Sequence, residues 1–168
     1  MVILGLDPGT AITGFGLLRV EGGRKTVIDY GTLETSKGPS DAARLMQVFD
    51  EAEDLLRRAK PDAIAIEHLF FGRNVSTMLS VGRASGVLLL AAAKAGIEIA
   101  EYTPMQVKMA VVGYGNADKK QVQAMVQRIL DLPEIPKPDD VADALALAIC
   151  HAHTYRIAAV NPGRVGKR

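Results

Sequence analysis

Four acidic residues in apolar surroundings are the side chains of this sequence best suited to chemistry. Asp7 ends the apolar run that opens the chain, and Glu67 ends a second short apolar run. Asp140 and Asp143 lie in a third apolar segment, DDVADALALA. An acid in a buried setting is costly to desolvate unless a partner or a cation compensates its charge. Because Mg²⁺ and Mn²⁺ prefer carboxylate oxygens, these acids indicate a site for a hard divalent cation.

Each acid also has an ordinary structural interpretation. Asp7 precedes a Pro-Gly pair and can cap that turn. Asp140 and Asp143, three residues apart, can complement the dipole of a helix N-terminus for about 0.3–1 kcal/mol. Together, however, closely spaced acids repel one another without a cation. The sequence offers no persuasive Ser-His or Cys-His nucleophile, so we expect a metal-activated water, as in nucleases that hold two ions about 4 Å apart.

Apolar periodicity and turn residues predict the elements that must bring these acids together. The chain opens with three strands in an antiparallel meander, followed by alternating helices and strands and then by helices. Asn116 is expected to cap the helix that contains Val122. The predicted strands are 1–7, Ala11–Leu18, Lys25–Thr35, Asp62–Glu67 and Ile97–Tyr102, and the helices begin at Pro39-Ser40, Val75, Thr103, Asn116 and Asp139, with the last ending near Ile157.

This order predicts one α/β domain with a mixed five-stranded central sheet and helices on both faces. If the strands that end at Asp7 and Glu67 are parallel, both carboxylates reach the same edge of the sheet, where open α/β sheets bind ligands. The expected domain covers residues 1–158. Residues 159–168 are expected to form a flexible basic tail.

The composition limits the possible classes of protein. The chain has 168 residues and a net charge of +1, so any nucleic-acid footprint must be local. Its one cysteine, Cys150, follows an apolar run and suits a reducing cytoplasm. The N-terminus does not resemble a signal peptide, and no apolar block approaches the ~20 residues that span a bilayer. We therefore expect a cytoplasmic protein without a membrane partner.

Basic residues near the acidic segments predict a local DNA-binding surface. Phosphate neutralisation supplies much of the affinity of a nuclease for DNA. The alternative is that these residues are ordinary solvated cations, the usual state of exposed lysine. The candidates are Arg73, Lys108, Lys119 and Lys120.

Two aromatic residues, Phe70 and Phe71, follow Glu67 closely and lead into a Gly-Arg-Asn segment. An exposed aromatic ring can stack on an unpaired base, which contributes roughly 1–3 kcal/mol. The alternative is that one or both rings cover the edge of the core, since phenylalanine is usually buried.

Five short segments carry motifs that occur together in one family: Leu4-Gly-Leu-Asp-Pro-Gly-Thr10, Ala65-Ile-Glu-His-Leu-Phe70, Pro104-Met-Gln-Val-Lys108, Ala117-Asp-Lys-Lys-Gln-Val122 and Asp140-Val-Ala-Asp-Ala-Leu-Ala146. In this order, over roughly residues 2–155, they resemble the RuvC family of bacterial Holliday junction resolvases, which has an RNase H-like fold. The resemblance implies a homodimeric endonuclease that makes paired symmetric nicks in four-way DNA junctions during recombination and repair. It also implies the branch-migration proteins RuvA and RuvB as partners.

The resemblance assigns roles to individual residues. It places Asp7, Glu67, Asp140 and Asp143 on the carboxylates with which the family binds metal, and it implies two Mg²⁺ or Mn²⁺ ions per site. Lys108 and Lys119 match positions that the family uses for DNA and catalysis, and Phe70 matches the aromatic residue associated with the junction. The role of His68, which follows Glu67, stays open.

Three other functions are compatible with parts of the pattern. The Asp-x-Gly-Thr segment at Asp7 also occurs in the phosphate loops of actin-like kinases and ATPases, although those proteins need two such lobes. A module that binds junctions without cutting them would keep the fold but not the chemistry, and the presence of all four acids argues against it. A related nuclease that processes RNA is the third alternative.

Overall fold

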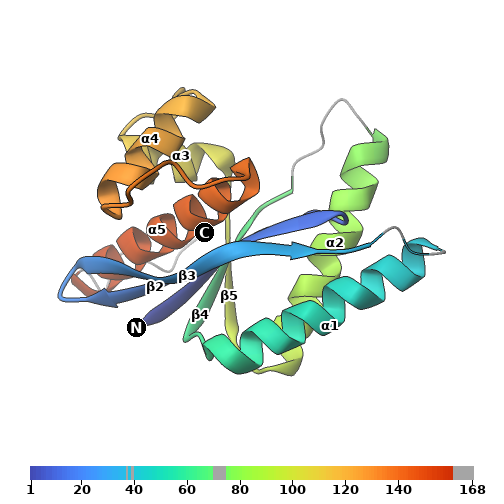
Figure 1. The fold of residues 1–168 in the computed structure, drawn as a ribbon. Coiled ribbons are helices and arrows are strands. Elements are labelled where there is room, and N and C mark those ends of the chain that lie inside the picture. The colour runs from blue at the N-terminus through green and yellow to red at the C-terminus, as the bar shows by residue number, and fades with distance from the viewer. Residues whose placement is uncertain (37, 39, 70–74, 161–168) are drawn as a thin grey trace.

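The computed structural model describes residues 1–36, 38, 40–69 and 75–160, with side chains excluded at 75–77 and 156–160. Within these residues the chain forms a mixed five-stranded sheet covered by helices (Figure 1). The strands are β1 (Val2–Asp7), β2 (Ile12–Glu21), β3 (Arg24–Glu34), β4 (Ala63–Glu67) and β5 (Glu98–Tyr102). The helices are α1 (Asp41–Ala59), α2 (Val75–Lys94), α3 (Pro104–Val112), α4 (Lys119–Ile129) and α5 (Asp139–Val160).

The sheet has the strand order β3-β2-β1-β4-β5. β1 pairs with β2, and β2 with β3, in antiparallel ladders, whereas β1 with β4 and β4 with β5 pair in parallel. A parallel neighbour requires a crossover, and α1 and α2 supply these connections. The predicted mixed α/β sheet with an antiparallel meander is therefore confirmed.

The two faces of the sheet bury two separate apolar cores. Alternate residues of β1 point to opposite faces, so Ile3 joins one core while Leu4 and Leu6 join the other. The core that contains Ile3 packs against α3, α4 and α5, and the other packs against α1 and α2. Figure 1 shows these two helical layers on either side of the sheet.

Local capping interactions explain where three of the helices begin. The Ser40 side chain accepts a hydrogen bond from the Ala43 backbone N–H and caps α1. Thr103 and Gln106 form the predicted capping box of α3. The predicted cap of α4 was wrong, because Asp118 rather than Asn116 caps this helix through a second capping box.

Helix α5 lies directly on the backbone of β1 and β2. A Cβ atom at Gly5 would collide with the Ala144 carbonyl oxygen, and one at Gly14 would collide with the backbone of Asp140. The glycines at these positions therefore permit a helix-to-sheet approach that no other residue allows. This contact brings the first turns of α5 over the end of β1.

None of the helices in the described part of the chain is both long and apolar enough to cross a lipid bilayer.

Candidate active site

The four predicted acids reach one edge of the sheet. Asp7 and Glu67 are the last residues of the parallel neighbours β1 and β4, so their side chains emerge together. Gly14 lies opposite Asp7 in the β1–β2 ladder, and the backbone of Asp140 packs against Gly14. Helix α5 therefore begins directly over the end of β1.

The electrostatics of Asp7 reflect the proximity of these acids. Its pKa is raised from 3.8 to about 8, first because burial penalises the charged carboxylate. The negative charges of Asp143, Glu67 and Asp140 raise it further, in that order, and Lys119 acts in the opposite direction. Each of the three other predicted acids is thus close enough to perturb Asp7.

Glu67 and Asp143 show the same effect. Burial is the largest cause of the raised pKa of each carboxyl group. Asp143 raises the pKa of Glu67, while Lys119 lowers the pKa of both acids and only partly offsets the effect of burial. The site therefore holds more negative charge than the protein itself compensates.

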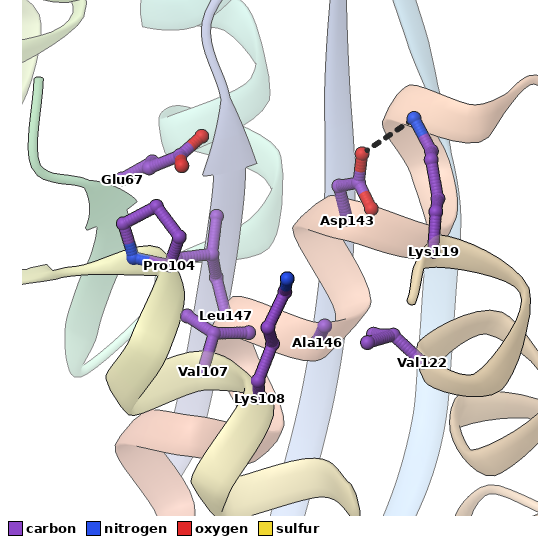
Figure 2. A pocket seen from close by; sticks show the side chains of 9 residues that line it. All are labelled: Glu67, Pro104, Val107, Lys108, Lys119, Val122, Asp143, Ala146 and Leu147. Atoms are coloured by element: carbon purple, nitrogen blue, oxygen red, sulfur yellow. Dashed lines mark ion pairs between the residues drawn. The ribbon is translucent and has the colours of Figure 1, made fainter. Parts of the chain in front are cut away.

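Lys119 is the cation that this acidic cluster holds. Its Nζ lies 3.1 Å from an oxygen of Asp143 and 3.2 Å from an oxygen of Asp139. Burial is the largest single influence on its pKa and lowers it, but the hydrogen bonds and charges of Asp143 and Asp139 outweigh this effect and raise the pKa. Lys119 therefore stays positively charged beside the site (Figure 2).

A cavity of about 210 Å³ opens between β4, α3, α4 and α5. Figure 2 shows Glu67 on one side, Asp143 with Lys119 on the other, and the Lys108 side chain pointing toward the space between them. Asp7 and Asp140 lie outside its lining. The cavity is lined by Glu67, Pro104, Val107, Lys108, Lys119, Val122, Asp143, Ala146 and Leu147.

The donor set fits a hard cation by its chemistry. The negative charges of neighbouring carboxylates raise the pKa values of these acids, and a bound divalent ion would offset that repulsion. Oxygen is also the ligand that such ions prefer. The acids do not form a closed coordination shell in this structure. Among the described residues, no three acidic, histidine or cysteine side chains are grouped tightly enough to enclose an ion. Lys119 provides the local countercharge instead.

The predicted DNA-binding residues fall into three groups. Lys108 and Lys119 line the cavity, next to the acids. Lys120 is exposed on α4 and is not part of the lining. Phe70, Phe71 and Arg73 lie outside the described residues.

Two polar residues beside the site have partners that the sequence did not indicate. Asp139 pairs with Lys119 and also accepts a hydrogen bond of 3.0 Å from the side chain of Gln123. The Nδ1 of His68 lies within hydrogen-bond distance, 2.8 Å, of a carboxyl oxygen of Glu101 on β5. The repeated acid at Asp139-Asp140 was the only available signal for the first pair, and it does not tell which acid meets the lysine.

The comparisons with known proteins agree with this geometry. A family model described as "Crossover junction endodeoxyribonuclease RuvC" matches residues 3–151. Two relatives, both named crossover junction endodeoxyribonuclease RuvC, match most of the sequence. The protein from Syntrophomonas wolfei is 56% identical over 94% of this chain and 91% of the relative. The protein from Heliobacterium modesticaldum is 57% identical over 92% of this chain and 95% of the relative.

Solved structures give the same result. Thermus thermophilus RuvC, in a structure described as a complex with Holliday junction substrate, superimposes with a TM-score of 0.88 at 38% identity. The match covers 94% of this chain and 96% of that protein. With four acids at one sheet edge, two lysines beside them and matches over nearly the whole sequence, this chain belongs to the RuvC family of crossover junction endodeoxyribonucleases.

Proposed function

We propose that this chain cuts four-way DNA junctions by metal-dependent hydrolysis of phosphodiester bonds. The observation that carries the proposal is the cluster of Asp7, Glu67, Asp140 and Asp143, in which burial and mutual repulsion raise the pKa of Asp7 to about 8. The family membership and the Thermus thermophilus structure with its Holliday junction substrate support the choice of DNA junctions as the substrate.

The same four carboxylates would hold the metal, and we propose two Mg²⁺ or Mn²⁺ ions per site. When bound, such ions supply a nucleophilic water and stabilise the negative charge that develops on the attacking and leaving oxygens. They would also compensate the excess negative charge at Asp7, Glu67 and Asp143 that Lys119 offsets only in part.

The two lysines at the cavity would bind the DNA backbone around the scissile phosphate. Lys119 would then exchange part of its interaction with Asp143 for a phosphate, leaving that carboxylate available to a cation. Lys108 would contact a phosphate from the opposite side, where its side chain enters the cavity (Figure 2). We propose that Lys120, Phe70, Phe71 and Arg73 also contact the DNA.

A homodimer is the assembly that fits the substrate. A four-way junction has approximate two-fold symmetry, and a two-fold dimer holds two identical sites in a fixed relation to it. In this proposal residues 1–158 form the nuclease domain and 159–168 a basic tail. The enzyme acts in the cytoplasm with RuvA and RuvB.

Mapping the cut strands of a synthetic four-way junction tests the function directly. We expect paired nicks at symmetry-related positions that require Mg²⁺ or Mn²⁺ and disappear with a chelator. Junction binding without cleavage under any divalent ion would support the binding module instead. Equal cleavage of linear duplex DNA and of the junction would contradict the proposed substrate.

A further inference from the structure

A second polar cavity lies on the other face of the sheet, between the first part of α1 and α2. It measures about 190 Å³, and its polar lining consists of Thr10, Asp41, Arg44, Ser80 and Arg83. α1 and α2 form the helical layer opposite α5 (Figure 1), so this cavity is separate from the one that contains Lys108. We call it the arginine pocket.

The guanidinium group of Arg44 is incompletely satisfied in this pocket. Its Nη2 donates two long hydrogen bonds of 3.4 Å, to the Thr10 carbonyl oxygen and the Thr35 hydroxyl. Its Nε is buried and has no hydrogen-bond partner within the described residues. A buried donor without an acceptor is unfavourable, so the group is suited to an added acceptor.

The second arginine has a partner that can be exchanged. Arg83 contacts Asp41 at 2.9 Å, but the two side chains are 46% and 79% exposed. Exposed ion pairs of this kind contribute little to stability, so an incoming anion can replace the carboxylate. The hydroxyls of Thr10 and Ser80 share a 2.8 Å hydrogen bond, which leaves one hydroxyl proton of the pair to donate from the same wall.

Two guanidinium groups and the remaining hydroxyl donor form a set suited to a tetrahedral oxyanion such as phosphate. The pocket is also near the acidic site, since Thr10 follows Asp7 by three residues, which span at most about 11 Å. At a rise of about 3.4 Å per nucleotide, that distance corresponds to only a few nucleotides of one strand.

We propose that the arginine pocket binds a backbone phosphate of the DNA strand whose scissile phosphate lies at the acidic cluster. In the absence of DNA, Asp41 occupies Arg83, and the phosphate takes its place on binding. This inference rests on the proposed function. It adds a second anchor, on the opposite face of the sheet, that fixes the strand as it crosses the sheet edge at Asp7.

Arg83→Gln is the decisive variant because Arg83 is half exposed and pairs with an exposed carboxylate, so its loss should leave the fold intact. Binding to a four-way junction is measured by fluorescence anisotropy in a chelator over a series of salt concentrations, so that cleavage does not contribute. We expect affinity to fall by about tenfold and the slope of log K against log salt to become shallower by about one. Asp41→Asn, which frees Arg83, should tighten binding.

Arg57→Gln is the matched control. Arg57 lies near the C-terminal end of α1 and pairs with exposed Asp54 at 2.6 Å, so the variant removes the same charge from a similar ion pair. It should retain the wild-type slope. An Arg83→Gln protein with the wild-type slope would overturn the pocket while leaving the proposed function intact, whereas a wild-type protein that does not bind junctions would overturn both.

Neutral methylphosphonates, placed one at a time around the cut site, identify the phosphate. We expect one position, distinct from the scissile one, to weaken wild-type binding by about tenfold and to have no further effect on Arg83→Gln. Inorganic phosphate, titrated calorimetrically, separates the two sources of this chemistry. If it binds the wild-type protein while the methylphosphonate profiles of the two proteins are identical, the pocket holds a small free anion and the proposal is wrong.

Discussion

The two ends of α5 treat their polar residues in opposite ways. Near its C-terminal end the buried His151 shares a 2.8 Å hydrogen bond with the Tyr102 hydroxyl, and Thr154 donates to the Cys150 carbonyl oxygen. At its N-terminal end Asp143 faces Asp7 and Glu67, and burial and repulsion raise the pKa of all three. One end is satisfied internally, as stable cores are. The other end needs a positive charge from outside, which is the property of a site rather than of a core.

The largest expected effect comes from removing the acid at the centre of the cluster. Asp7→Asn keeps the size of the side chain but removes its negative charge, so we expect junction cleavage to fall by about 10³-fold or more, equivalent to about 4 kcal/mol. Junction binding in a chelator should persist. If the variant cuts at the wild-type rate, Asp7 is not part of the active site. The contrast drawn between the two ends of α5 would then be wrong.

The same substitution should stabilise the metal-free protein. The pKa of Asp7 is about 8 in the folded state against an ordinary value of 3.8 for the unfolded chain, so ionisation favours unfolding increasingly as the pH rises between these values. Asp7→Asn should therefore raise the free energy of unfolding by a few kcal/mol at pH 8, and by little near pH 4.

Urea denaturation in a chelator at several pH values measures this difference. Added Mg²⁺ or Mn²⁺ should raise the midpoint for the wild-type protein and have a smaller effect on Asp7→Asn, because ions that bind the folded state stabilise it. Equal stability of the two proteins at pH 8 would show that the pKa of Asp7 is not raised in the folded state.

Lys119→Gln should have an intermediate effect. Its loss leaves Asp143 and Asp139 without their countercharge, which should lower the metal-free stability by roughly 0.5–1 kcal/mol, given the exposure of the pair. Affinity for a junction should fall by about tenfold through the loss of a phosphate contact. Lys120→Gln, one residue along and outside the cavity lining, is the control for stability. An equal loss of metal-free stability in both variants would contradict the role of the ion pair.

The smallest effect is expected at the satisfied end of the helix. Burial lowers the pKa of His151 below 6.5, only partly opposed by Glu98, so its neutral form is favoured in the folded state. The resulting stability is present above pH 6.5 and is lost as the pH falls below it. His151→Asn should flatten the stability profile on the acid side of pH 6.5, because the side chain that replaces His151 does not titrate there. Parallel profiles for the two proteins would show that His151 does not titrate in this range.

The sequence was sufficient to predict the order of the helices and strands and the acids at the ends of two strands. The terminal positions of Asp7 and Glu67 predicted that both reach one edge if their strands are parallel, and β1 and β4 do pair in parallel. Gly14 and Gly16 of β2 leave room for α5, which packs directly against both residues.

What the sequence could not supply depends on tertiary packing. The cap of α4 is an exception, because its signal is local: the Asp118 N–H donates to the side chain of Gln121, three residues along, and the two residues form a capping box. Which acids meet Lys119, in contrast, depends on how α4 packs against α5, and no local pattern encodes that contact. The arginine pocket has the same origin, because its residues come from three distant segments.

The glycine contacts beneath α5 have a consequence for how this site can vary. At Gly5 and Gly14 the backbone of the strand packs against the backbone of α5, so the separation between helix and strand is set by contact between backbone atoms and not by the sizes of core side chains. Substitutions elsewhere in the interior can therefore accumulate without altering the spacing of the acids. Even one methyl group added at Gly14 would lift the start of the helix away from Asp7, so tolerance to mutation should be lowest where the residues are smallest.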